Sequence, residues 1–170
     1  MSIGIDSMVL IYAGLVPVNP QSRSQDYEEL RIRATLLIHR CAHDKTTIFL
    51  PTVAISELLV PVPRVQKGAL IAALQKRFVC APFDLPAAAI AADLWVEHKK
   101  LPQDMQYRDR HVLRADTCIV ASVFAAGARE FYTHDEKCRA LAGLIMTARD
   151  LPTRDPNDMF LADDIRRGEV

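Results

Sequence analysis

Short apolar segments rich in β-branched residues alternate along the chain with longer segments of helical periodicity. Strands joined by helices at this spacing predict a parallel sheet covered by helices, an α/β sandwich. Pro51 fits the first turn of a helix, whereas Pro61 and Pro63 end one. The expected strands cover residues 3–5, 47–50, 77–81, 130–133 and 145–148, and the expected helices cover residues 7–15, 26–43, 52–59, 67–75, 86–99, 115–126 and 137–144.

The length of the chain predicts one folded domain. Its 170 residues are enough to bury a core without covalent cross-links. We expect this domain to cover residues 1–150, because prolines and alternating charges make residues 151–170 typical of a tail. Lysine plus arginine and aspartate plus glutamate number 21 each, so no overall positive field attracts nucleic acid. Nucleic-acid binding would therefore depend on local patches or on bound cations.

The cysteines and histidines form none of the common zinc motifs. Cys41, Cys80, Cys118 and Cys138 are far apart in the sequence, and none of the five histidines completes a metal-binding pair. The first residues do not resemble a secretory signal, and no run of about 18 apolar residues is present. We therefore expect reduced thiols, a cytoplasmic location and no membrane span.

Acidic residues follow two of the expected strands. Asp6 comes directly after the first strand, and Asp135 comes two residues after the strand that ends at Thr133. In parallel α/β sheets, ligands bind at the carboxyl ends of the strands. These two carboxylates are therefore expected at the binding edge of the sheet.

Two further carboxylates occur in helices on apolar stripes. Asp116 is placed at the start of a helix, with Ile119, Val120 and Val123 following at helical spacing. Glu57 has the same relation to the apolar residues around it, and both side chains are expected to point inward. Asp93, on an alanine-rich helix, is a further acidic candidate of the same kind.

Inward-pointing carboxylates are costly unless they are paired or bound to a metal. Mg²⁺ and Mn²⁺ prefer carboxylate oxygens, and two such ions can hold and cleave a phosphodiester. Taken singly, each residue also has a structural interpretation, as a helix cap, a charge at a helix N-terminus or a solvated helix residue. Together they favour one metal-dependent catalytic site, made by Asp6, Glu57, Asp116 and Asp135.

With these residues placed, the sequence resembles the PIN-domain family, and within it the toxins of bacterial VapBC-type toxin–antitoxin pairs. The resemblance covers roughly residues 2–148. One further segment, Phe83-Asp84-Leu85-Pro86 with the alanine-rich helix to Trp95, is also similar to that family. The motifs that carry the resemblance are Ile5-Asp6-Ser7, Pro51-Thr52-Val53-Ala54-Ile55-Ser56-Glu57-Leu58, Asp116-Thr117-Cys118-Ile119-Val120-Ala121 and Thr133-His134-Asp135.

The resemblance implies a three-layer α/β/α sandwich with a five-stranded parallel sheet and a Mg²⁺- or Mn²⁺-dependent endoribonuclease. It implies that Ser7 and Thr133 support the carboxylates. It also implies an antitoxin protein as partner and a homodimer, for which the apolar residues Val60, Val62 and Val65 are candidates. Where the family often carries a lysine shortly before the third acidic residue, this chain has Arg114, which bears on the substrate and not on the carboxylates.

A local basic patch precedes Asp116 in the sequence. Lys99, Arg110 and Arg114 are its candidate RNA contacts, since cations beside a metal site can hold RNA phosphates. A solvated loop explains the same charges equally well.

Other enzymes on similar sheets fit the motifs less well. A phosphatase of the haloacid dehalogenase type needs a second aspartate two residues after the first, where this chain has Met8. A receiver domain needs a paired acidic start and a later lysine at a strand end, and neither is visible. The remaining alternative is a PIN fold that binds nucleic acid or protein without catalysis. The presence of all four acidic residues argues against this alternative.

Overall fold

The computed structural model describes residues 1–16 and 26–153. Residues 17–24, whose prolines and polar residues predict a loop, and the tail beyond residue 153 lie outside these residues. A short 3₁₀ helix, His98–Lys100, follows the helix Leu85–Glu97. The helices and strands in chain order are β1 (Ser2–Ile5), α1 (Ser7–Tyr12), α2 (Tyr27–His43), β2 (Thr47–Pro51), α3 (Thr52–Leu59), α4 (Arg64–Arg77), β3 (Val79–Ala81), α5 (Leu85–Glu97), α6 (Arg110–Ala125), β4 (Glu130–Tyr132), α7 (Glu136–Ala142) and β5 (Thr147–Arg149).

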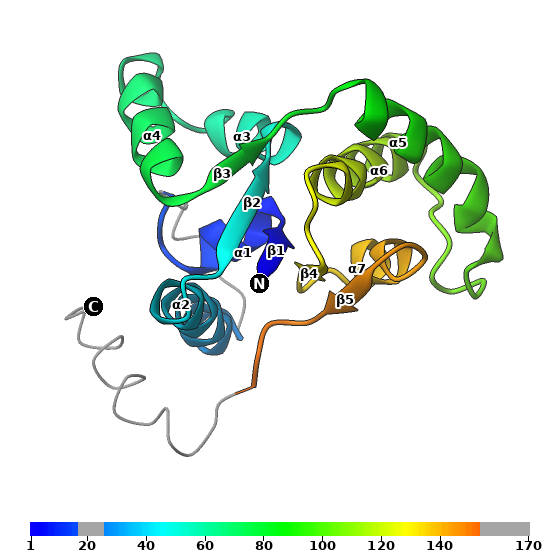
Figure 1. Ribbon diagram of the computed structural model, residues 1–170, viewed down its shortest axis with the longest axis horizontal. Helices are drawn as coiled ribbons and strands as arrows, with labels where there is room; N and C mark the ends of the chain where they lie inside the picture. Colours follow the sequence, from blue (N-terminus) through cyan, green and yellow to red (C-terminus); the bar gives the residue numbers. More distant parts are fainter. Residues whose placement is uncertain (17–25, 154–170) are drawn as a thin grey trace.

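The five strands form one parallel sheet in the order β3-β2-β1-β4-β5 (Figure 1). The central strand β1 pairs with β2 on one side, where Ile3 lies opposite Ile48, and with β4 on the other, where Ile5 lies opposite Tyr132. All carboxyl ends therefore face one edge, as the alternation of strands and helices predicts. The expected α/β/α sandwich with a five-stranded parallel sheet is confirmed.

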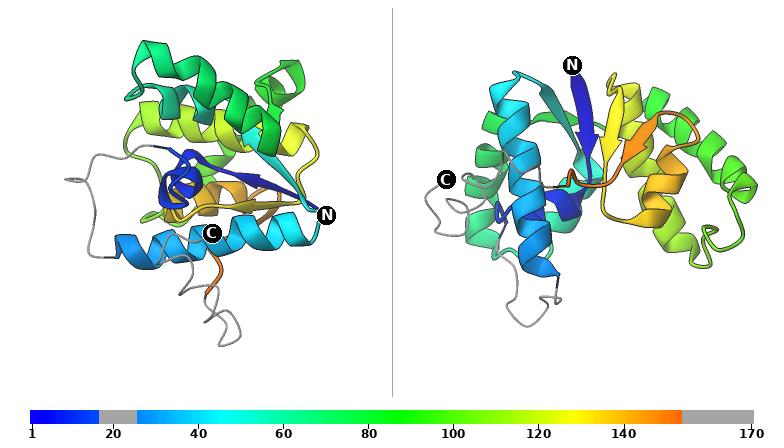
Figure 2. Two further views of the ribbon diagram at one scale, coloured as in Figure 1. Left: turned by 90° about the vertical axis from the view of Figure 1, so that its left-hand side faces the viewer. Right: turned by 90° about the horizontal axis from the view of Figure 1, so that it is seen from below.

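Helices cover both faces of the sheet. Figure 2 shows α2 along one face and α6 along the other, with α5 outside α6. Strand β1 is buried between these layers, and the side chains of Ile3 and Ile5 are almost inaccessible to solvent. Helix α2 contributes Leu30, Ala34 and Leu37 to the same core, which is the apolar stripe that its sequence predicts. The core therefore holds the carboxyl end of β1 in a fixed place.

Several element boundaries differ from the sequence prediction, and the largest difference is at the start of α6. Helix α6 begins at Arg110 and not at residue 115, so Asp116 lies in its second turn. The earlier start follows from Asp109, whose side chain caps the helix by accepting a hydrogen bond of 2.7 Å from the backbone N–H of His111. This cap lies in a charged segment without apolar periodicity, which is why the segment reads as a loop.

Gly4 lets β1 and α6 come into close contact. A Cβ atom added at Gly4 would lie 2.7 Å from both Cβ and Cγ2 of Val123, a fully buried residue of α6. Atoms this close must move, and both the strand and the helix are held by the core. The close contact sets the distance between α6, which carries Asp116, and β1, which ends before Asp6.

We therefore predict that Gly4→Ala destabilises the protein by about 1–3 kcal/mol, because the added methyl group overpacks the β1–α6 contact. Urea denaturation followed by circular dichroism measures the change. Gly68→Ala in α4 is the matched control, since no atom lies within 4 Å of its added Cβ and alanine favours helix by roughly 0.5–1 kcal/mol. Equal unfolding midpoints for Gly4→Ala and the wild type would contradict the close contact.

Candidate active site

Four carboxylates gather at the carboxyl edge of the sheet, as the sequence predicts. Asp6 caps α1 directly after β1, and Asp135 caps α7 after β4. Glu57 comes from α3, and Asp116 comes from α6. The charges of Asp135, Asp6 and Glu57 all act on the carboxyl group of Asp116, so the four side chains share one neighbourhood.

Thr133 joins two of these carboxylates. Its hydroxyl group donates to Asp6 Oδ2 and accepts a hydrogen bond of 3.0 Å from the backbone N–H of Asp135. Both Thr133 and Asp6 are buried, and Asp6 Oδ1 accepts from the backbone N–H of Val9 at 3.0 Å. Thr133 thus holds Asp6 and the backbone of Asp135 together, which is the supporting position expected for it.

Glu57 is bound to the other supporting residue but is not buried. Ser7 Oγ donates a hydrogen bond of 2.9 Å to Glu57 Oε2. The expectation that Glu57 points into an apolar interior is wrong, because the side chain is exposed and Val60 on the same helix end is 79% exposed. Helix α3 is short and only Ala54 and Leu58 are buried in it, so its apolar residues do not define one inward face.

Asp116 is half-buried and has a partner that the sequence did not reveal. The hydroxyl group of Tyr107 donates a hydrogen bond of 2.7 Å to Asp116 Oδ2. Tyr107 comes from the segment between α5 and α6, where no periodicity pointed to a role for any residue. Asp116 heads the buried stripe of Ile119, Val120 and Val123, as its helical phase predicts.

Burial makes the two inner carboxyl groups hard to ionise. Loss of solvent raises the pKa of Asp6 to about 6, and the charges of Asp135 and Glu57 add to the effect, whereas hydrogen bonds from Thr133 and Val9 oppose it. The same cause raises the pKa of Asp116 to about 7, against the hydrogen bond from Tyr107. Near neutral pH, protonation therefore competes with ionisation at these two carboxyl groups, because burial and the neighbouring carboxylates disfavour their charged form.

The structure offers this charge no cationic partner among the described residues. None of the four carboxylates forms an ion pair there, although seven such pairs occur elsewhere in the described chain. Three oxygens accept no hydrogen bond from a described residue: Glu57 Oε1, Asp116 Oδ1 and Asp135 Oδ2. In residues 1–16 and 26–153, no three His, Cys, Asp or Glu side chains are already grouped closely enough to hold a metal ion.

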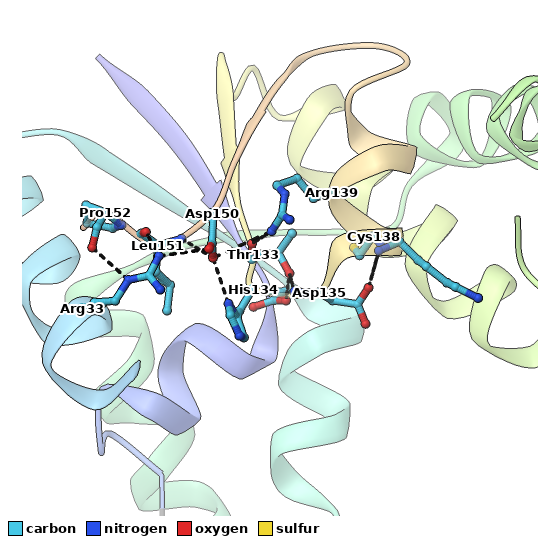
Figure 3. A network of polar contacts seen from close by, with 11 residues as sticks. Arg33, Thr133, His134, Asp135, Cys138, Arg139, Asp150, Leu151 and Pro152 are labelled. Atoms are coloured by element: carbon cyan, nitrogen blue, oxygen red, sulfur yellow. Dashed lines mark hydrogen bonds and ion pairs between the residues drawn. The ribbon is translucent and has the colours of Figure 1, made fainter. Parts of the chain in front are cut away.

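A fifth carboxylate at the same edge, Asp150, has cationic partners. Asp150 follows β5, and its Oδ2 accepts a hydrogen bond of 3.0 Å from Arg33, while its Oδ1 lies 3.0 Å from His134 Nδ1 and 3.8 Å from Arg139 Nη1 (Figure 3). Burial acts to raise the pKa of Asp150, but the hydrogen bonds from His134 and Arg33 outweigh it and lower the pKa. Arg139 also donates to the carbonyl of Thr133 at 3.2 Å. This network fixes the loop that carries Thr133 and Asp135.

The candidate RNA contacts lie apart from the carboxylates. The guanidinium groups of Arg110 and Arg114 lie 5.6 and 5.9 Å from the centre of the Trp95 ring, on the α5–α6 side. Lys99 is exposed, in the 3₁₀ helix that follows α5. None of the three contacts a site carboxylate within hydrogen-bonding distance among the described residues.

The remaining candidates take ordinary places. Asp93 is exposed on α5 and does not reach the site, because its neighbour Val96 also faces solvent and the helix buries only Ala87, Ala91 and Leu94. The four cysteines are free. In the described residues, no helix is long and apolar enough to cross a membrane.

Comparison with known proteins finds a structural likeness without a sequence relative. No family model matches the chain, and no curated protein matches it. The fold is similar to a chain in the crystal structure of VapBC2 from Rickettsia felis bound to a DNA fragment from its promoter. The TM-score is 0.56, the identity is 14%, and the match covers 89% of this chain and 100% of that chain. At this identity the likeness shows the fold alone.

The raised pKa values predict how stability depends on pH without added metal. A folded carboxyl group with a raised pKa binds its proton more tightly than the unfolded chain does, so stability is lost as pH rises from about 4 through about 7. Asp116→Asn removes this loss and should stabilise the protein at pH 8 by roughly 1–3 kcal/mol, and by less at pH 5. Denaturation in EDTA at both pH values measures it.

Two further variants bracket this prediction. Asp93→Asn, an exposed substitution on α5, should leave the pH dependence unchanged. Tyr107→Phe removes the hydrogen bond that lowers the pKa of Asp116, so the loss of stability should extend to higher pH. If Asp116→Asn gives the same gain at pH 5 and pH 8, Asp116 does not titrate in the raised range.

Proposed function

We propose that this chain is a divalent-cation-dependent endoribonuclease that cleaves RNA phosphodiester bonds, and that it acts as the toxin of a toxin–antitoxin pair. Asp6, Glu57, Asp116 and Asp135 are its catalytic carboxylates, and Mg²⁺ or Mn²⁺ is its cofactor. The observation that carries the proposal is the gathering of four carboxylates at the edge of the sheet with no cationic partner among the described residues.

The donor set fits a hard divalent cation. All four groups are carboxylates, which Mg²⁺ and Mn²⁺ prefer, and three of them keep an oxygen that accepts no hydrogen bond from a described residue. The observed side-chain positions do not form a finished cage. Glu57 and Asp135 are exposed, and Glu57 Oε1 and Asp135 Oδ2, which accept no hydrogen bond from a described residue, remain available to a cation.

Each residue has a distinct task in this proposal. Asp6 and Asp116 hold the cation from rigid positions, because β1 and α6 fix them in the core. Glu57 and Asp135 complete the coordination and orient the attacking water. Ser7 and Thr133 hold carboxylate oxygens in place. A bound divalent cation supplies the positive charge that stabilises the phosphate as its bond breaks and activates water at neutral pH.

RNA phosphates would be held on the α5–α6 side. Arg110 and Arg114 stack on Trp95, which reduces the freedom that they lose when they bind a phosphate. Lys99 adds a third cation from the turn after α5. Because the whole chain has no net charge, such local contacts have to supply the attraction for RNA.

The toxin role is supported by the similar fold of a chain in the structure of VapBC2 bound to a promoter DNA fragment. We propose an antitoxin protein as partner and a homodimer as the assembly. Val60, directly after α3, and Val65, in the first turn of α4, are 79% and 91% exposed and are suited to a subunit interface, whereas Val62 is buried and does not take part.

The proposed activity predicts metal-dependent cleavage of RNA. The wild type should cut single-stranded RNA in Mg²⁺ or Mn²⁺ and stop in EDTA, and Asp6→Asn or Asp116→Asn should reduce the rate by at least about 100-fold, because both remove a charge that holds the cation. Gel electrophoresis of end-labelled RNA measures the rate. Mg²⁺ should also raise the melting temperature of the wild type and not of Asp116→Asn.

Asp104→Asn, in the exposed segment before α6, is the matched control and should cut at the wild-type rate. Cleavage that survives EDTA, or variants as fast as the wild type, would leave the non-catalytic PIN-like binding module as the explanation. If the chain is a toxin, its expression should also arrest bacterial growth, and expression of Asp116→Asn should not.

The proposed homodimer predicts that Val65→Lys shifts the protein toward monomer in analytical ultracentrifugation, because a charge then replaces an apolar contact. Arg64→Lys, beside it on α4, keeps the charge and should leave the assembly unchanged. A wild type that sediments as a monomer at all concentrations would remove the dimer from the proposal.

A further inference from the structure

Three aromatic side chains lie together beside the carboxylates, and their rings take no part in the cleavage proposed above. Tyr12 ends α1, Tyr27 begins α2, and His134 follows β4. The rings of Tyr12 and Tyr27 have centroids 6.0 Å apart at an interplanar angle of 61°, and those of Tyr12 and His134 are 6.1 Å apart at 80°. We call these three residues the aromatic cluster, which has Tyr12 at its centre.

The aromatic cluster adjoins the candidate site at two points. His134 stands in the chain between Thr133, which binds Asp6, and Asp135. Tyr12 ends α1, the helix that Asp6 caps, and its ring contacts the ring of His134. The cluster is therefore continuous with the carboxylates on the α1–α2 side of the sheet edge.

The rings are not part of the closed core. Tyr12, Tyr27 and His134 are all partly exposed, and 41% of the His134 side chain is accessible. These rings leave part of their surface open at the point where a substrate would approach the carboxylates.

The ring of His134 is held in one orientation by two neighbours. Its Nδ1 lies 3.0 Å from Asp150 Oδ1, and Asp150 is held by Arg33 of α2 at 3.0 Å (Figure 3). The ring of Tyr12 packs against the same histidine. A ring held on two sides loses little freedom when a ligand stacks on it, which favours binding.

We propose that the aromatic cluster stacks unpaired bases of single-stranded RNA next to the phosphodiester that the carboxylates cleave. The proposal rests on the proposed function and adds to it the residues that hold the bases of the substrate. Every base has a face that stacks on an aromatic ring, and proteins use such rings to hold single-stranded RNA without reading its sequence. A duplex keeps its bases stacked internally and does not offer them, so the cluster selects loops and unpaired segments.

The test measures binding of a fluorescein-labelled single-stranded oligoribonucleotide by anisotropy, with Ca²⁺ in place of Mg²⁺ to slow cleavage. Tyr27→Leu and His134→Leu should each weaken binding roughly 5- to 100-fold, because each removes a stacking ring but keeps an apolar side chain. Tyr27→Phe keeps the ring and should bind within about twofold of the wild type. Phe124→Leu, an exposed aromatic of α6, is the control at another place and should bind like the wild type.

A second probe separates stacking from a general loss of structure. An oligoribonucleotide of the same length that lacks its bases should bind the wild type and the two leucine variants equally, since only the backbone remains. RNA duplex should bind more weakly than the single strand and should not discriminate between the proteins. A variant that loses affinity for the abasic strand as well has lost more than stacking, and this result overturns the proposal.

The outcomes distinguish this inference from the function on which it rests. If the wild type cleaves RNA in Mg²⁺ but the leucine variants bind and cut like the wild type, the aromatic cluster has no role and the nuclease stands. If stacking is lost in the variants but no protein cleaves RNA, the cluster binds RNA and the nuclease fails. If the wild type does not bind single-stranded RNA, the proposal is overturned.

Discussion

The pairing of β1 with its two parallel neighbours is the constraint on which the site depends. It aligns the carboxyl ends of β1 and β4, so that Asp6 and Thr133, 127 residues apart in the sequence, come within hydrogen-bonding contact. Gly4 allows α6 to lie close against the same strand and brings Asp116 to this edge. Because each of these positions is tied to the core, the inner carboxylates stay buried and close to one another. Burial is the main reason that their pKa values rise, and repulsion between the carboxylates adds to it.

Asp150 differs from the four site carboxylates in having cationic partners. All five are at one edge of the sheet, but Asp150 meets Arg33, His134 and Arg139, and the others meet no cation among the described residues. The fold therefore neutralises the charge of Asp150, which fixes a loop, and leaves the four neighbouring carboxylates without a cation among the described residues. Proteins bear such a cost at sites that bind charge from outside.

Different surfaces flank the carboxylates on the two sides of the sheet. The α1–α2 side carries the aromatic rings of Tyr12, Tyr27 and His134, and the α5–α6 side carries Arg110 and Arg114 stacked on Trp95. In the proposed function, bases would lie on the first side and phosphates on the second. A strand of RNA that crosses the edge would then present its backbone to the carboxylates between them.

The sequence by itself determined the fold class and the places of three carboxylates, because apolar periodicity places Asp6 and Asp135 after strands and Asp116 at the head of a buried stripe. The exposure of Glu57 could not be predicted from its helical phase, because the neighbours that would bury a short helix come from elsewhere in the chain. For the same reason only the tertiary structure revealed Tyr107 as the partner of Asp116, and the aromatic cluster around Tyr12. These contacts join residues whose local sequence carries no signal, and only the packing of whole elements brings them together.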